Sequence, residues 1–274
     1  MSHVTFWTFL RDQTEYGSGF ATFGMEHRLF LAFIVLGLYA ACVLYHHASG
    51  PVRTNVFRIW TVITLSLEVL RQIVIIAAVH PYPVTELPLN LCGLFVFVGV
   101  IHAFKPNISP KKSARPTVSD RPTVSDRPWS EITGELLYCL GLPAALSALL
   151  TPDWTRYPVL NFHSLHAFII HGLLLGTPLL LLAGGWKPNF KNLWKAAACL
   201  GVTAMLLAII NSILHTNFMF LSWPAKGTLL ELFDNWFGAL GSHGYLLGLG
   251  LLLITIWIIM YLPWIIADLQ KKKE

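Results

Sequence analysis

The chain has few charged residues. Only 12% of its 274 residues are Asp, Glu, Lys or Arg, whereas 55% are hydrophobic. Soluble domains carry about 25% charged residues, so this scarcity excludes an ordinary soluble fold. It predicts a polytopic membrane protein that forms a single integral membrane domain over residues 1–274. The formal charge of +5 comes from loops between apolar runs, which positive-inside topology explains more simply than binding to nucleic acid.

Cysteine is also scarce. The four cysteines show no paired or metal-ligand spacing, so the sequence predicts neither a disulfide framework nor a cysteine-based metal site, and it indicates no cofactor; they are Cys42, Cys92, Cys139 and Cys199. A signal peptide is not expected, because the first 27 residues contain acidic residues and no compact apolar stretch. We interpret residues 1–27 as an outer N-terminal segment.

Long apolar runs are abundant. A bilayer is crossed by about 20 apolar residues, and seven runs come near that length: 28–47, 56–79, 87–104, 132–150, 161–183, 192–214 and 243–266. The fourth contains Gly141 and Pro143, which membrane helices tolerate when neighbouring helices satisfy the freed carbonyl groups. The predicted fold class is therefore all-α, a seven-transmembrane helix bundle.

The loops predict the orientation of the bundle. Most Lys and Arg residues follow spans one, three and five or lie in the tail, which predicts an outer N-terminus and a cytoplasmic C-terminus, in the plasma membrane if the protein is bacterial. Residues 105–130 contain a tandem Arg-Pro-Thr-Val-Ser-Asp repeat, and their composition predicts a disordered cytoplasmic loop. Residues 267–274 are expected to form a basic cytoplasmic tail. Residues 228–237 between spans six and seven predict a short interfacial helix.

The stretch Leu87–Phe95 differs from an ordinary lipid-facing helix. Pro88 suits the first turn of a helix, and Asn90 and Cys92 follow within the first two turns. A cysteine near a helix N-terminus lies where the macrodipole and the unpaired N–H groups favour its thiolate. Cys92 is therefore the candidate nucleophile.

Span two carries Glu68 and Arg71 in its predicted outer half. They are three residues apart on one helical face, near enough to pair. Intramembrane charges are costly and are functional candidates, but for this pair we favour a structural or tuning ion pair that locks the bundle.

Span five carries several histidines. His171 lies about 15 Å along the helix from its start, at 1.5 Å per residue, and a histidine at that depth needs a partner. It is the candidate general base for Cys92, with a hydrogen-bonded core histidine as the alternative. Ser164 shares its face, whereas His163 and His166 lie nearer the outer surface, where they would position substrate or hold water.

Span six ends with Asn211, His215 and Asn217, the first two sharing a face at i, i+4. With Asn90 they could stabilise an oxyanion or hold a lipid headgroup, and interhelical hydrogen bonding is the alternative. The inner half looks poorer, because its polar residues lie at span ends, where anchoring explains them: Arg58, His102 and Lys195.

Several of these segments together resemble the YwaF-like family of bacterial integral membrane proteins. They are Leu87–Cys92, Ala144–Asp153, Phe168–Gly172, Asn217–Leu221 and Thr228–Glu231. The family looks akin to a vertebrate transmembrane acyltransferase that remodels ether phospholipids, and more distantly to the androgen-induced and androgen-dependent membrane hydrolases. The resemblance implies that Cys92 and His171 carry the chemistry. It departs at Asn90, where the family usually has His.

Three function classes follow. The first is a membrane-embedded lipid acyltransferase or lipid ester hydrolase that forms an acyl thioester on Cys92, with membrane lipids as partners. The second is a seven-helix lipid or small-molecule binding or transport protein. The third uses histidine ligands: haem is disfavoured because the histidines lie at different depths, and a zinc site would need three convergent ligands, for which His163, His166 and His215 are the candidates.

Overall fold

The computed structural model describes residues 19–104, 128–226 and 228–271. Within these ranges every regular element is helical, which confirms the all-α prediction. Most of the predicted outer segment and cytoplasmic loop lies outside the described residues. The longer elements are α1 Met25–His47, α2 Gly50–Ala78, α3 Leu91–Phe104, α4 Pro128–Leu136, the π-helical segment η3 Leu137–Gly141, α5 Leu142–Leu150, α6 Phe162–Ala183, α7 Leu193–Leu214, α8 Leu229–Phe237 and α9 Tyr245–Lys271.

Six helices are long and apolar enough to cross a membrane: α1, α2, the continuous α4–η3–α5, α6, α7 with its preceding turn, and α9. The helix α3 is apolar but has only 14 residues, about 21 Å at 1.5 Å per residue, which is shorter than a hydrocarbon core of about 30 Å. The structure therefore has six candidate spans and one shorter apolar helix where the sequence predicted seven spans.

The predicted third span was wrong at its start. Pro88 does not open α3, because the chain turns at residues 87–90, where the Leu89 N–H donates to the Leu87 carbonyl at 2.7 Å. The turn returns the Pro88 carbonyl to the first turn of α3, where a Cβ on Gly93 would lie only 2.6 Å from it. The end of α9 also differs from the prediction, since residues 267–271 continue the helix.

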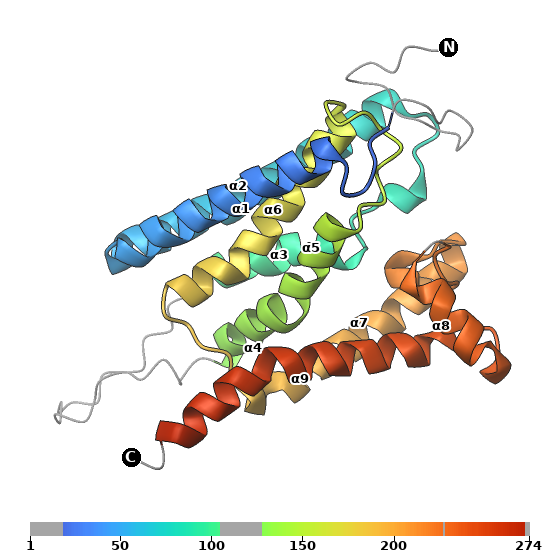
Figure 1. Cartoon of the computed structure of the whole chain (residues 1–274). Helices are drawn as coiled ribbons and strands as arrows, with labels where there is room; N and C mark the ends of the chain where they lie inside the picture. The colour runs from blue at the N-terminus through green and yellow to red at the C-terminus, as the bar shows by residue number, and fades with distance from the viewer. Residues whose placement is uncertain (1–18, 105–127, 227, 272–274) are drawn as a thin grey trace.

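The helices run between two faces of the bundle (Figure 1). We call one of them the N-terminal face: α1, α3, α6 and α9 begin there, and α2, α5 and α7 end there. At the opposite face, the C-terminal face, α1, α3, α6 and α9 end and α2 and α7 begin. His27 ties the N-terminal face together, because its Nδ1 accepts from the Phe23 N–H and its Nε2–H donates to the Leu149 carbonyl, both at 2.8 Å. At the C-terminal face the Arg53 guanidinium donates to the Gly184 carbonyl at 3.2 Å.

The helix α6 is the most deeply buried of the long helices and packs against α1, α2 and α5. Gly176 permits the closest approach, since a Cβ there would lie 2.4 Å from the Trp60 ring and 2.7 Å from Leu38. Trp60 also donates its Nε1–H to the Leu173 carbonyl at 2.9 Å. In contrast, α7 and α9 bury few of their residues, as expected for helices that face lipid.

The fourth predicted span is distorted but continuous near Pro143, where its sequence indicated an irregularity. Residues Leu137–Gly141 are π-helical, and Pro143 lacks the N–H that would donate to the Cys139 carbonyl in a regular α-helix. Trp257 of α9 supplies a donor instead, with its Nε1 3.0 Å from that carbonyl oxygen. This confirms that a neighbouring helix satisfies the freed carbonyl.

The short helix α8 confirms the helix predicted at residues 228–237. The Thr228 side chain caps it by accepting the Leu230 N–H at 3.1 Å. Phe233 packs against Gly248 of α9 and Leu230 is buried, whereas Leu229, Leu232 and Trp236 stay exposed. The helix is therefore amphipathic and is held to the bundle by one face.

Candidate functional site

A network of charged residues joins the end of α2 to the short helix η1, Val84–Glu86. Arg71 donates to the Glu68 carboxylate at 3.2 Å, so the predicted pair is present, and it also donates to the carboxylate of Glu86. Sequence reasoning missed Glu86, because it lies in a connection without helical periodicity. With two carboxylates on one guanidinium, the cluster has a local charge of one negative unit, and Arg71 is not available as a free cation.

Gln72 and Tyr82 extend this network. The Gln72 amide donates to the Glu68 carboxylate at 2.8 Å and to the Glu86 carbonyl at 3.0 Å. The Tyr82 hydroxyl donates to the Gln72 side-chain oxygen at 2.6 Å. Burial raises the pKa of Tyr82, so its hydroxyl keeps its proton and remains a donor at neutral pH. Together these contacts fix the α2–α3 connection close to the N-terminal face.

The first two histidines of α6 lie against neighbouring elements. The His163 ring packs on Tyr157 with ring centroids 4.6 Å apart. His166 is only 6% exposed, and its Nε2–H donates to the Leu67 carbonyl of α2 at 3.2 Å. Both are close enough to Arg71 for their charges to interact. His166 therefore links α6 to α2.

His171 has a defined tautomer. Its Nδ1 lies 2.7 Å from the Ala167 carbonyl oxygen, and since a carbonyl can only accept, Nδ1 must carry the hydrogen. In the neutral ring Nε2 then keeps its lone pair, and it makes no hydrogen bond with any described residue. The ring stacks on Trp154 with centroids 5.1 Å apart and an interplanar angle of 11°. The arrangement presents an oriented base.

Cys92 is the second residue of α3 and is half-buried, so it lies in the first helical turn as predicted. In the described part of the chain no hydrogen bond joins it to His171. Asp153, in the α5–α6 connection, is close enough to interact electrostatically with both Cys92 and His171. Sequence reasoning did not single out Asp153, whose only signal was its place just beyond span four, at the same end of the bundle as Cys92.

The polar residues at the end of α7 mainly hold their own turn. The Asn211 side chain donates to the Phe218 carbonyl at 3.0 Å and accepts the Phe218 N–H at 2.8 Å. Asn217 accepts the N–H groups of Ser222 and Trp223. These bonds favour a structural role for both amides over an oxyanion role. His215 is exposed and lies outside the helix with φ 53°, so the expectation that it shares a helical face with Asn211 was wrong.

Asn90 connects this turn to the start of α3. Its side-chain oxygen accepts the Met219 N–H at 3.1 Å, while its amide N–H groups have no partner among the described residues. Met219 and the following Phe220 both have φ 55°, a left-handed conformation that is strained for such side chains. The Asn90 amide therefore has free N–H donors two residues before Cys92.

The C-terminal half of the bundle contains a buried polar group that the sequence analysis missed. Glu135 is 1% exposed and accepts the Tyr261 hydroxyl and the Asn189 N–H, both at 2.5 Å. The expectation of a poor inner half was therefore wrong. A single carboxylate in an apolar run gave no pattern, and its partner Tyr261 lies 126 residues further along the chain.

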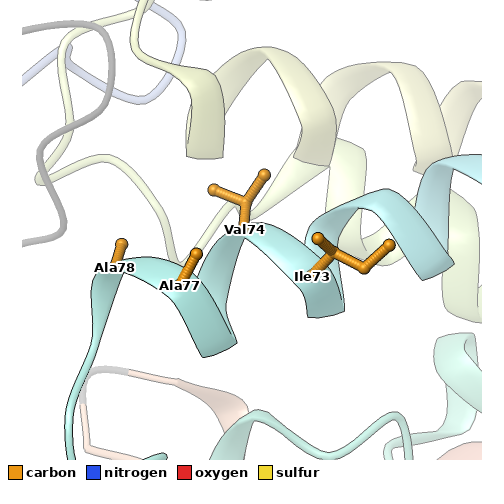
Figure 2. Close-up of a pocket in the computed structure, with 4 residues that line it drawn as sticks. All are labelled: Ile73, Val74, Ala77 and Ala78. Atoms are coloured by element: carbon orange, nitrogen blue, oxygen red, sulfur yellow. The ribbon is translucent and has the colours of Figure 1, made fainter.

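The described residues show no metal site, and they contain one apolar recess of note. Over residues 19–104, 128–226 and 228–271, no three His, Cys, Asp or Glu side chains come together in a way that could hold a metal ion, so the zinc alternative gains no geometric support. An apolar recess of about 330 Å³ lies on α2, lined by Ile73, Val74, Ala77 and Ala78. Figure 2 shows these four side chains along the last turns of the helix, which follow Arg71 and Gln72 in the sequence.

A comparison with protein families gives a match over most of the chain. The sequence model of the TMEM164 family, a family of membrane proteins, matches residues 22–261, a range that includes Cys92 and His171. No curated protein and no solved structure matches the chain. With its six long apolar helices, this match identifies an integral membrane protein. The chain belongs to the TMEM164 family.

Proposed function

We propose that the protein is a lipid acyltransferase or lipid ester hydrolase with Cys92 as nucleophile and His171 as general base. The observation that carries the proposal is the lone pair left on His171 Nε2 by the bond from Nδ1 to the Ala167 carbonyl. The kinship with the YwaF-like proteins and the ether-phospholipid acyltransferase is part of this proposal. So is the orientation with the N-terminal face outside, which would open the site to the outer leaflet.

In the first half-reaction the Cys92 thiol gives its proton to His171 Nε2 while the sulfur bonds to the carbonyl carbon of a lipid ester. The carbonyl π electrons move to the oxygen, giving a tetrahedral intermediate. The C–O bond to the lysolipid then breaks, and the departing oxygen takes the proton from His171. An acyl thioester remains on Cys92.

In the second half-reaction a hydroxyl group attacks the thioester and gives its proton to His171. The C–S bond breaks, and the proton returns to the Cys92 sulfur. A lysolipid hydroxyl gives acyl transfer and water gives hydrolysis. We favour transfer, because a thioester reacts readily with oxygen nucleophiles and an apolar surrounding keeps the concentration of water low.

The other site residues have supporting roles in this mechanism. The free amide N–H groups of Asn90 would donate to the developing oxyanion. Ser164 lies two turns from His171 on the same face of α6 and is fully buried, so it would contact the bound ester. His166 holds α6 against α2 and so keeps the base in place, while the Glu68–Arg71 pair fixes the α2–α3 connection that leads to Cys92.

Lipid or small-molecule binding or transport without catalysis is the second candidate. The observation that favours it is the apolar recess on α2 (Figure 2), which has the chemistry to hold an acyl chain whether or not a reaction follows. The two functions differ in one respect, since only the enzyme forms a covalent bond to Cys92.

The test uses purified protein and mixed phospholipids with a labelled acyl chain. Peptide mass spectrometry should find the label on Cys92 as a hydroxylamine-labile thioester. Cys92→Ala and His171→Ala should abolish the label, and Cys199→Ala, which removes another half-buried thiol, should leave it unchanged. Folded wild-type protein that gains no label from any lipid class would refute catalysis and favour the binding role.

A further inference from the structure

Trp154 is a buried side chain with an unused hydrogen-bond donor. It is 3% exposed, and its indole Nε1–H has no acceptor among the described residues. The other indoles of the bundle for which a bond is known behave differently: Trp60, Trp257 and Trp264 each donate to an oxygen of another helix at 2.9–3.0 Å. A buried donor without a partner is destabilising, so its presence calls for a physical reason.

The position of Trp154 suggests that reason. Its ring stacks on His171, as described above, and meets the edge of Phe168 with centroids 5.4 Å apart. Phe168 and His171 share one face of α6 with Ser164, at i+4 and i+7. Ser164 is fully buried, and its hydroxyl also has no partner in the described part of the chain. The Ser164 hydroxyl and the Trp154 indole N–H are therefore two unused donors near the candidate base. Ser164 lies on the face of α6 that carries His171, and the Trp154 ring stacks on His171.

We propose that the Trp154 indole N–H donates a hydrogen bond to the carbonyl oxygen of the lipid ester that Cys92 attacks. The inference rests on the proposed function and adds a residue to it. An indole N–H can only donate, so it suits an oxygen that gains negative charge. Its stacking on His171 brings the donor next to the base, in a surrounding that excludes water and strengthens the bond.

Trp154→Phe tests this, because phenylalanine keeps an aromatic ring that can stack on His171 and removes the N–H together with the fused second ring. We expect the rate of Cys92 acylation to fall roughly 10²–10³-fold, the loss typical of one oxyanion donor, with little change in the lipid concentration that gives half the maximal rate. Trp154→Phe and Trp257→Phe remove the same ring volume, so Trp154→Phe should lower thermal stability less than Trp257→Phe, because the lost N–H of Trp154 has no protein partner. Trp257→Phe is the matched control: it should lower stability and leave acylation unchanged.

Alkylation of Cys92 by iodoacetamide separates the two roles that Trp154 could have. This reaction needs the thiolate and forms no oxyanion. If the N–H acts on the carbonyl oxygen, Trp154→Phe slows acylation and leaves alkylation unchanged. If alkylation slows to the same degree, Trp154 acts only through the position of His171, and the inference is overturned. Unchanged acylation overturns it as well.

A measurement independent of activity covers the case in which the enzyme proposal itself fails. In protein with ¹⁵N-labelled tryptophan, the Trp154 indole resonance is the one that Trp154→Phe removes. It should move downfield when mixed diacyl phospholipids replace detergent, while the Trp257 resonance stays in place. A shift without any acyl label on Cys92 would refute the catalytic proposal and support a lipid oxygen bound at Trp154. A resonance that does not move would overturn the inference.

Discussion

Replacing Trp257 by Phe should lower the free energy of unfolding by about 1–3 kcal/mol, the usual penalty for leaving a buried polar group unpaired. The reason is the distortion at Pro143. Because residue 143 has no N–H, the Cys139 carbonyl lacks its α-helical donor, and Cys139 is fully buried. The Trp257 indole is the donor that replaces it, at 3.0 Å, and no other donor to this carbonyl comes from outside the helix in the described residues.

Thermal unfolding of the purified protein measures the effect. At about 2–4 °C per kcal/mol for a chain of this size, the midpoint should fall by roughly 2–12 °C. Pro143→Ala provides the decisive background, because it restores an N–H at position 143 that can reach the Cys139 carbonyl. Trp257→Phe should therefore lower the midpoint less in Pro143→Ala than in the wild type. Equal losses in both backgrounds would refute the idea that Trp257 compensates for the proline.

Three further predictions concern the packing and the polar network. Gly176→Ala should lower stability by about 1–3 kcal/mol through overpacking against Trp60, and an unchanged unfolding midpoint would contradict the close approach. Arg71→Met should lower stability by about 3–5 kcal/mol, because it leaves the buried Glu68 carboxylate without a counter-charge; Arg71→Met combined with Glu68→Gln should recover part of that loss, and additive losses would argue against the pair. Asn211→Ala should increase cleavage of the 215–223 turn in limited proteolysis, and unchanged cleavage would show that this amide does not hold the turn.

The spans could be predicted because apolar runs in a membrane protein directly reflect burial in lipid. Most helix ends lie within a few residues of the prediction, and the short helix α8 was found from its amphipathic pattern. The start of α3 was missed, because Pro88 is compatible both with the first turn of a helix and with the turn before it. Only the contact between its carbonyl and Gly93 decides between the two.

The candidate site was predictable in depth but not in contacts. Helical rise placed Cys92 in the first turns of its span and His171 about 15 Å along its own span. It could not reveal that His171 uses Nδ1 on its own helix, because this depends on a side-chain rotamer. Glu86 and Asp153 were missed, since both lie in connections between helices, where no helical periodicity marks a side chain.

The bond between Asn90 and Met219 has a consequence for assembly of the protein during synthesis. It joins residues 129 positions apart, and chains emerge from the ribosome N-terminus first. When α3 is complete, its partner turn has not yet been translated, and four further candidate spans must follow before the last helix is in place. During synthesis the Cys92 region therefore lacks its contact with Met219 until the turn after α7 is made. A chain truncated before residue 219 would contain both candidate catalytic residues and would lack this contact.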